Sequence, residues 1–123
     1  MGEESTWFDY LPGLPGMTKM LKVYLGRADL LRILGALPPR ATLVFDEAYR
    51  EYVPRARYFD PTAIADPRLL VLRTFSKAHG LAGARIGYAI AAPDVIAAFD
   101  KFRLHFGVNR VAQAGALASL DDP

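Results

Sequence analysis

Apolar residues along the chain follow two different periodicities, which are separated by prolines and glycines. Three short apolar runs, 42–45, 69–72 and 86–92, are bounded by turn-forming residues, as buried β-strands are. Residues 28–37 instead carry leucines at helical spacing, and Pro38 ends this stretch. Strand-like and helix-like segments therefore alternate, which predicts an α/β domain with its strands buried between helices.

The second half of the chain predicts two further helices. Pro93 and Asp94 suit a helix start, because proline fits the first helical position and an acidic residue favours the first turn. Apolar residues then repeat at intervals of four, three and four: Val95, Phe99, Phe102 and Phe106. We expect this stripe to lie in the core, and Gly107 to end the helix. Residues 108–120 form a second, alanine-rich helical run.

Titratable side chains follow the first two strand-like runs at the point where each run ends. Asp46 comes directly after 42–45, and Tyr49 lies three residues further on. Lys77 follows 69–72 after the four residues Arg-Thr-Phe-Ser and enters a glycine-containing loop. In open α/β sheets, ligands bind at the carboxyl ends of the strands. We therefore expect Asp46 and Lys77 to share one site at the edge of the sheet.

A lysine, a carboxylate, a phenol, a hydroxyl and an arginine around one site favour pyridoxal 5'-phosphate chemistry. The lysine amine forms a Schiff base with the aldehyde of this cofactor. A carboxylate keeps a proton on the pyridine nitrogen, so that the ring can withdraw electrons from the substrate. The guanidinium fork of an arginine, helped by a hydroxyl, suits the phosphate group.

Two segments carry a resemblance to a known family. FDEAY (45–49) and RTFSKAHGLAGARIGY (73–88) resemble the signature segments of fold-type I pyridoxal-phosphate aminotransferases, in particular the histidinol-phosphate aminotransferase branch. HFGVNRVAQAGALASL (105–120) is similar to a helical segment of that branch. The resemblance covers roughly residues 24–123 and implies part of the large domain of the aspartate-aminotransferase-like fold, three-layered with a mostly parallel sheet. Residues 1–23 are expected to form an atypical N-terminal segment outside it.

The resemblance implies a role for five side chains. Lys77 would form the Schiff base and move the substrate proton, and Asp46 would pair with the pyridine nitrogen. Tyr49 would touch the ring hydroxyl, while Ser76 and Arg85 would bind the phosphate. The implied reaction transfers an amino group from an amino acid, of the histidinol-phosphate or aromatic type, to a 2-oxo acid. The full-length enzymes of this family are homodimers, and a role in amino-acid biosynthesis, including histidine biosynthesis, would follow.

Two other interpretations remain open. The family carries an asparagine that supports the cofactor ring ahead of this region, whereas the only asparagine of this chain is Asn109. The chain could therefore be a truncated, non-catalytic fragment that binds only the cofactor or a partner subunit. Alternatively, an apolar strand followed by Asp46 and Glu47 resembles the magnesium-holding strand end of a nucleotide hydrolase. That reading lacks the phosphate-binding G-x-x-x-x-G-K-[ST] loop, which the sequence does not contain.

The composition argues against several classes of partner and site. The formal net charge of +2, without a basic block, gives no reason to expect a nucleic-acid partner. The absence of cysteine removes disulfides and thiolate metal sites, and His79 and His105 have no second ligand at metal-binding spacing. No apolar run reaches the length of a membrane span. We therefore expect a cytoplasmic protein that acts on small molecules, without a metal or a membrane.

Overall fold

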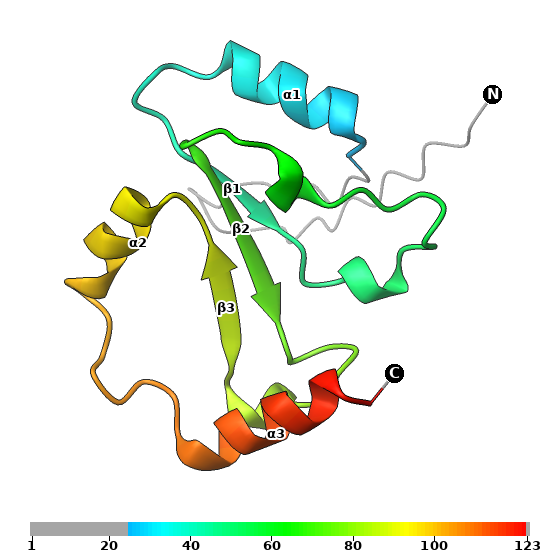
Figure 1. Cartoon of the computed structure of the whole chain (residues 1–123), viewed down its shortest axis with the longest axis vertical. Helices are drawn as coiled ribbons and strands as arrows, with labels where there is room; N and C mark the ends of the chain where they lie inside the picture. The colour runs from blue at the N-terminus through cyan, green and yellow to red at the C-terminus, as the bar shows by residue number, and fades with distance from the viewer. Residues whose placement is uncertain (1–24, 123) are drawn as a thin grey trace, which may run out of the picture.

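The structure is a computed structural model that describes residues 25–122 of the 123-residue chain, so the atypical segment expected at 1–23 lies outside the described residues. In chain order its main elements are α1 (Arg27–Ala36), β1 (Leu43–Asp46), β2 (Leu69–Thr74), β3 (Gly87–Ile90), α2 (Pro93–Asp100) and α3 (Arg110–Leu120) (Figure 1). Short 3-10 turns lie in the connections: η1 (Arg50–Tyr52), η2 (Pro61–Ala63) and η3 (Ala82–Ala84). This is the α/β organisation that the alternating periodicities predict. No helix within 25–122 has the length and apolar character that crossing a membrane requires.

The sheet of the described region is mixed, with the strand order β1-β2-β3. Strands β1 and β2 are parallel, with Leu43 opposite Leu69, whereas β2 and β3 are antiparallel, with Thr74 opposite Gly87. The expectation of a mostly parallel sheet therefore holds for the first pair of strands only. The loop 75–86 explains the difference, because a parallel return needs a long crossover, usually an α-helix, and this loop contains only the η3 turn.

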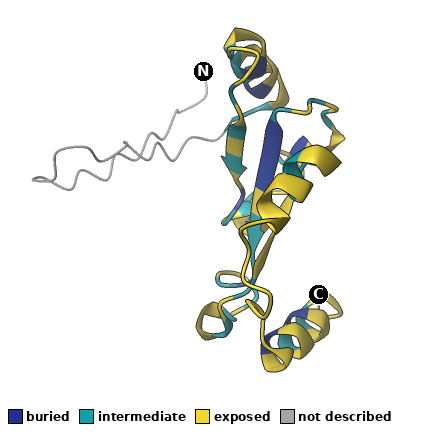
Figure 2. Ribbon diagram, turned by 90° about the vertical axis from the view of Figure 1, so that its left-hand side faces the viewer, coloured by how far each residue is buried: buried dark blue, intermediate teal, exposed yellow. Residues whose placement is uncertain are grey.

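One face of the sheet carries the hydrophobic core. Leu30 and Leu34, one helical turn apart on α1, are buried against Leu69 and Val71 of β2. The partly buried side chains packed around this cluster are Leu37, Leu43, Phe45, Phe59 and Ile64. Figure 2 shows β2 as the buried centre of the sheet, flanked by less buried strands. The core thus holds β1 and β2 side by side and fixes the edge at which both strands end.

The second helix and its phenylalanine stripe differ from the prediction. Helix α2 ends at Asp100, and the amides of Phe102 and Arg103 both donate to the carbonyl of Phe99 just beyond it. Phe102 is 86% and Phe106 is 96% exposed, so the expectation that the stripe lies in the core is wrong for the structure described here (Figure 2). Helical stability in proteins comes mainly from packing. Because Phe102 and Phe106 lie open to solvent here, they do not extend the helix to Gly107.

Helix α3 lies beside the loop that joins β2 to β3 (Figure 1). Its start is capped by Asn109, whose side-chain oxygen accepts a hydrogen bond from the Ala112 amide at 2.8 Å. The helix buries Ala112 and Ala116, and a side chain at Gly115 would touch Leu81 of the loop at 3.6 Å. Helix α3 therefore supports the loop that carries the predicted lysine.

Candidate functional site

The predicted site residues gather at one edge of the sheet. Strands β1 and β2 end there and β3 begins there, since Asp46 lies opposite Leu72 and Thr74 lies opposite Gly87 (Figure 1). The segment after β1, the loop after β2 and the residues just before β3 therefore leave from the same edge. These three segments, together with the last residue of β1, contain all five predicted site residues: Asp46, Tyr49, Ser76, Lys77 and Arg85.

Asp46 lies on the face of the sheet that points away from the core. Side chains of β1 alternate between faces, and Leu43 and Phe45 pack into the core, so Asp46 projects from the opposite face. Its Oδ1 accepts a hydrogen bond from the Ala48 amide at 2.9 Å. This turn holds the carboxylate at the strand end while leaving the residue exposed.

Lys77 and Tyr49 meet in space although they follow different strands. The Nζ atom of Lys77 lies 5.1 Å from the centre of the Tyr49 ring, within the range of a cation–π contact. Tyr49 stands at the start of the η1 turn and is 49% exposed, and Lys77 is exposed as well. The pair brings the amine and the phenol together on a surface that a small molecule can reach.

The loop around Lys77 is folded tightly by its own hydrogen bonds. The Ser76 amide donates to Oγ1 of Thr74 at 3.1 Å, and the Gly80 amide donates to the carbonyl of Lys77 at 2.9 Å. Gly80 has a φ of 67°, a left-handed conformation that glycine adopts without steric cost. The turn therefore presents Ser76 and Lys77 next to each other, directly beyond the end of β2.

Arg85 adopts an unusual backbone conformation between the η3 turn and β3. Its φ is 53° and its ψ is 50°, the left-handed region that costs a residue with a side chain about 1–2 kcal/mol. Its Nη1 donates to the carbonyl of Ala82 at 2.9 Å, and the residue is exposed. Residues with a strained backbone cluster at functional sites, and this one carries its guanidinium at the same edge as Lys77.

A polar network lies on the core side of the same strand ends, and the sequence analysis missed it. Nε of Arg73 donates to Oε2 of Glu47 at 2.8 Å, and the Tyr58 hydroxyl donates to Oε1 of Glu47 at 3.1 Å. Nη2 of Arg73 also reaches Asp60 at 2.9 Å. One signal pointed here: the alternation of side chains along β2 places Arg73 on the face opposite Thr74, where a charge needs a partner.

The electrostatics of this network follow from its burial. Burial by itself would lower the pKa of the Arg73 guanidinium, but its hydrogen bonds to Glu47 and Tyr88 and the Glu47 charge raise that pKa above its ordinary value. Burial likewise would raise the pKa of the Asp60 carboxyl, yet the hydrogen bonds from Thr62 and the pairing with Arg73 hold it below its usual range. The Arg73–Asp60 pair is therefore charged at neutral pH.

The network also bears on the magnesium interpretation. Asp46 projects from one face of the sheet, whereas Glu47 is buried on the other face and bonded to Arg73. The two carboxylates that a shared magnesium ion would need are thus separated by the sheet. Within residues 25–122, no three acidic, histidine or cysteine side chains gather in a way that could hold a metal ion.

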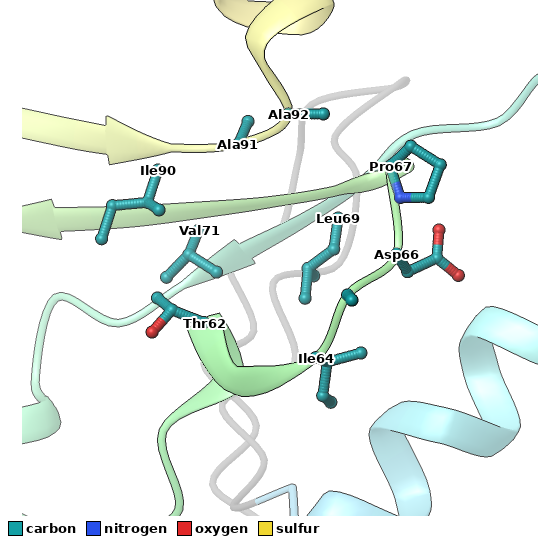
Figure 3. A pocket seen from close by; sticks show the side chains of 10 residues that line it. Thr62, Ile64, Asp66, Pro67, Leu69, Val71, Ile90, Ala91 and Ala92 are labelled. Carbon is teal, nitrogen blue, oxygen red and sulfur yellow. The ribbon is translucent and has the colours of Figure 1, made fainter.

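A pocket of about 330 Å³ lies at the other end of the strands, on the core side (Figure 3). It is lined by the start of β2, the end of β3 and the chain before β2, including Leu69, Val71, Ile90 and Ile64. Because β2 runs from this pocket toward Thr74, the pocket and the edge with Lys77 lie at opposite ends of the strand. The pocket is not part of the predicted site.

Comparison with known proteins shows one family. The sequence profile of the family "Aminotransferase class I and II" matches residues 23–123. An aromatic amino acid aminotransferase of Nocardia farcinica is 50% identical over 100 residues, which is 78% of this chain and 28% of that protein. Histidinol-phosphate aminotransferase 1 of Cupriavidus pinatubonensis is 47% identical over 97 residues, 77% of this chain and 26% of that protein.

Solved structures agree with this result. The histidinol-phosphate aminotransferase of Sinorhizobium meliloti, solved in complex with pyridoxal-5'-phosphate, superposes with a TM-score of 0.69 at 47% identity. The match covers 76% of this chain and 26% of that chain. The chain thus spans between a quarter and a third of the length of the relatives that it matches.

Proposed function

Since the chain belongs to the aminotransferase class I and II family, we propose that it carries the lysine-bearing edge of a pyridoxal-phosphate-dependent aminotransferase. The observation that carries the proposal is the gathering of Lys77, Asp46, Tyr49, Ser76 and Arg85 at one sheet edge. A relative of known structure binds pyridoxal-5'-phosphate, and it matches this chain at 47% identity. The amino donor proposed is histidinol phosphate or an aromatic amino acid, as in the names of the relatives.

The chemistry of the donor set fits the cofactor. Pyridoxal phosphate, when bound, supplies an aldehyde for a lysine amine and a protonated ring that withdraws electrons from the substrate. On this chain, an exposed amine, a carboxylate, a phenol, a hydroxyl and a guanidinium lie at the same edge of the sheet. An amine for the aldehyde, an acid for the ring nitrogen, and a guanidinium and a hydroxyl for the phosphate are therefore present at this edge.

Each side chain then has one task. Nζ of Lys77 would hold the cofactor covalently and, once the amino group of the substrate has replaced it, would be free to take up and return the substrate proton as a general acid and base. The Asp46 carboxylate, held in place by the Ala48 amide, keeps the proton on the ring nitrogen. The Tyr49 hydroxyl would contact the hydroxyl of the cofactor ring. Ser76 Oγ and the Arg85 guanidinium bind the phosphate, and Arg85 must exchange its bond to the loop backbone for this purpose.

We propose a 2-oxo acid as the amino acceptor and a homodimer as the assembly of the complete enzyme. The names of the relatives support an amino acceptor, since an aminotransferase needs one, and the homodimer rests on the resemblance to the family alone. A partner subunit that packed on Phe102 and Phe106 would remove two large, exposed apolar side chains from water.

Covalent trapping tests cofactor binding. The purified 123-residue chain is mixed with pyridoxal phosphate, reduced with borohydride and mapped by peptide mass spectrometry. The described residues contain two lysines, Lys77 and Lys101, so Lys101 provides a matched internal control. We expect the label on Lys77, its loss in Lys77→Ala and its persistence in Lys101→Ala. Equal labelling of both lysines would show that the site binds no cofactor specifically.

A second measurement separates catalysis from binding alone. The loaded chain is given histidinol phosphate or an aromatic amino acid together with 2-oxoglutarate, and the carbonyl product of the donor is quantified. Product that disappears in Lys77→Ala supports the aminotransferase. Labelling of Lys77 without any product would favour the alternative of a fragment that binds only the cofactor.

A further inference from the structure

Glu47 is the buried charged residue of the described chain. It is 7% exposed, and its side chain accepts from Nε of Arg73 at 2.8 Å and from the Tyr58 hydroxyl at 3.1 Å. The Arg73 side chain is itself only 10% exposed. Charges buried to this extent are costly unless they are paired and hydrogen-bonded, and these two satisfy each other.

The backbone of the two residues lies directly behind the candidate site. The Glu47 amide donates to the carbonyl of Leu72 at 2.9 Å, so the ion pair sits where β1 and β2 end. Glu47 follows Asp46, and Arg73 precedes Thr74, so each member of the pair is the immediate neighbour of a residue on the opposite face. A change in the distance between the two strand ends would move Asp46 relative to the Lys77 loop.

Arg73 also joins a third segment to the strand ends. Its Nη2 lies 2.9 Å from Oδ1 of Asp60 and 3.3 Å from the Tyr58 hydroxyl. A guanidinium can hold two carboxylates at once, because its donors form a rigid fork. The connection between β1 and β2, which contains Asp60, is thereby fastened to the same point.

We propose that the Glu47–Arg73 pair is a positioning device: it sets the spacing of the strand ends from which Asp46 and Lys77 reach the cofactor. The proposal rests on the proposed function for the identity of the ligand. A net gain in stability is a poor explanation for the pair, since a buried ion pair can often be replaced by apolar residues without loss of stability. What an apolar pair cannot replace is the directed link between β1, β2 and Asp60.

Amide hydrogen exchange tests whether the Glu47–Arg73 pair holds the two strand ends together, and it needs no cofactor. Arg73→Met removes the link at the site edge. Arg68→Met is the matched control, because Arg68 pairs with Asp66 at 2.7 Å at the opposite end of β2. Arg73→Met should speed exchange of the Glu47 amide about tenfold. It should leave exchange of the Leu43 amide, which donates to the backbone carbonyl of Arg68 at 2.8 Å, unchanged. Arg68→Met should leave the Glu47 amide unchanged.

Cofactor affinity tests the positioning role. The dissociation constant of pyridoxal phosphate, measured by absorbance titration, should rise about tenfold in Arg73→Met and stay within about twofold in Arg68→Met. The double variant Glu47→Leu/Arg73→Met removes both charges, so it should recover the thermal stability that Arg73→Met loses. It should not recover the affinity, which a purely structural role would restore. If Arg73→Met does not fold, exchange and affinity are read on this double variant.

The outcomes separate the two proposals. Wild-type exchange at the amide of residue 47 in Arg73→Met, or wild-type affinity in the double variant, would overturn the positioning role. A wild-type chain that binds no pyridoxal phosphate would overturn the proposed function. In that case the exchange pattern at Glu47 and Leu43 still decides whether the ion pair holds the strand ends.

Discussion

The Nζ atom of Lys77 lies 5.1 Å from the centre of the Tyr49 ring, although one residue follows β2 and the other follows β1. This contact exists because the two strands are parallel neighbours and end at the same edge. It places the amine that would hold the cofactor next to the phenol that would touch the cofactor ring. The relationship makes Tyr49 the most direct reporter of the site.

Tyr49→Phe keeps the aromatic face under Lys77 and removes the hydroxyl. A hydrogen bond contributes about 0.5–1.5 kcal/mol, so the affinity for pyridoxal phosphate should fall about two- to tenfold. Tyr49→Leu removes the ring as well and should bind more weakly still. Tyr52, whose ring centre lies 6.2 Å from that of Tyr49, provides the control. Tyr52→Phe should bind like the wild type; equal binding by Tyr49→Phe would remove the hydroxyl from the site.

Two substitutions at Arg85 separate its charge from its backbone. Arg85→Ala and Arg85→Gly both remove the guanidinium, and both should weaken cofactor binding at moderate concentration. Only glycine adopts the φ of 53° without strain, so Arg85→Gly should be more stable to unfolding than Arg85→Ala by about 1 kcal/mol. Denaturant titration and cofactor titration measure the two effects. Unchanged affinity in both variants would remove Arg85 from the phosphate site.

At Gly87, strand β3 lies too close to β2 for a side chain. A Cβ at this position would lie 2.7 Å from the carbonyl oxygen of Arg73, which is rigid strand backbone. Gly87→Ala should therefore destabilise the chain by about 1–3 kcal/mol. At Gly35, in helix α1, a Cβ meets no atom within 4 Å, so Gly35→Ala should raise stability by up to about 1 kcal/mol. Similar unfolding midpoints for the two variants would contradict the close approach.

Asp60 should make the stability of the chain depend on acidic pH. Its pKa in the folded chain lies below the ordinary value of 3.8, because its bonds to Thr62 and Arg73 outweigh the effect of burial. A lowered pKa means that its contribution is complete above pH 3.8 and is lost as the pH falls through the folded value. Denaturant titrations of the wild type and Asp60→Asn should show a difference in unfolding free energy that shrinks below that pH. A constant difference would contradict the assignment.

The local elements were predictable because their signals lie within a few neighbouring residues. Helix α1 begins and ends within one residue of the predicted stretch 28–37, since leucine spacing and the following prolines act locally. Strand β1 likewise lies within one residue of 42–45. The stripe from Val95 to Phe106 failed for the same reason: helical spacing shows that residues share a face, but it does not show that anything covers this face.

The Glu47–Arg73 pair escaped the sequence analysis because it depends on register. The two residues are 26 positions apart, and nothing near either one in the chain names the other as its partner. They meet only because Asp46 lies opposite Leu72 in a parallel pairing, which places the next residue of each strand side by side.

Sequence alone determined which chemical groups this protein offers and which strand ends they follow, because apolar runs and turn residues act over short distances. It placed Asp46 and Lys77 at one edge from these local patterns. Tertiary structure decided the rest: the antiparallel return of β3, the face from which Asp46 projects, and the burial of Glu47 against Arg73. These features arise from the pairing of strands and the packing of a core, and such contacts join residues that are distant in the chain.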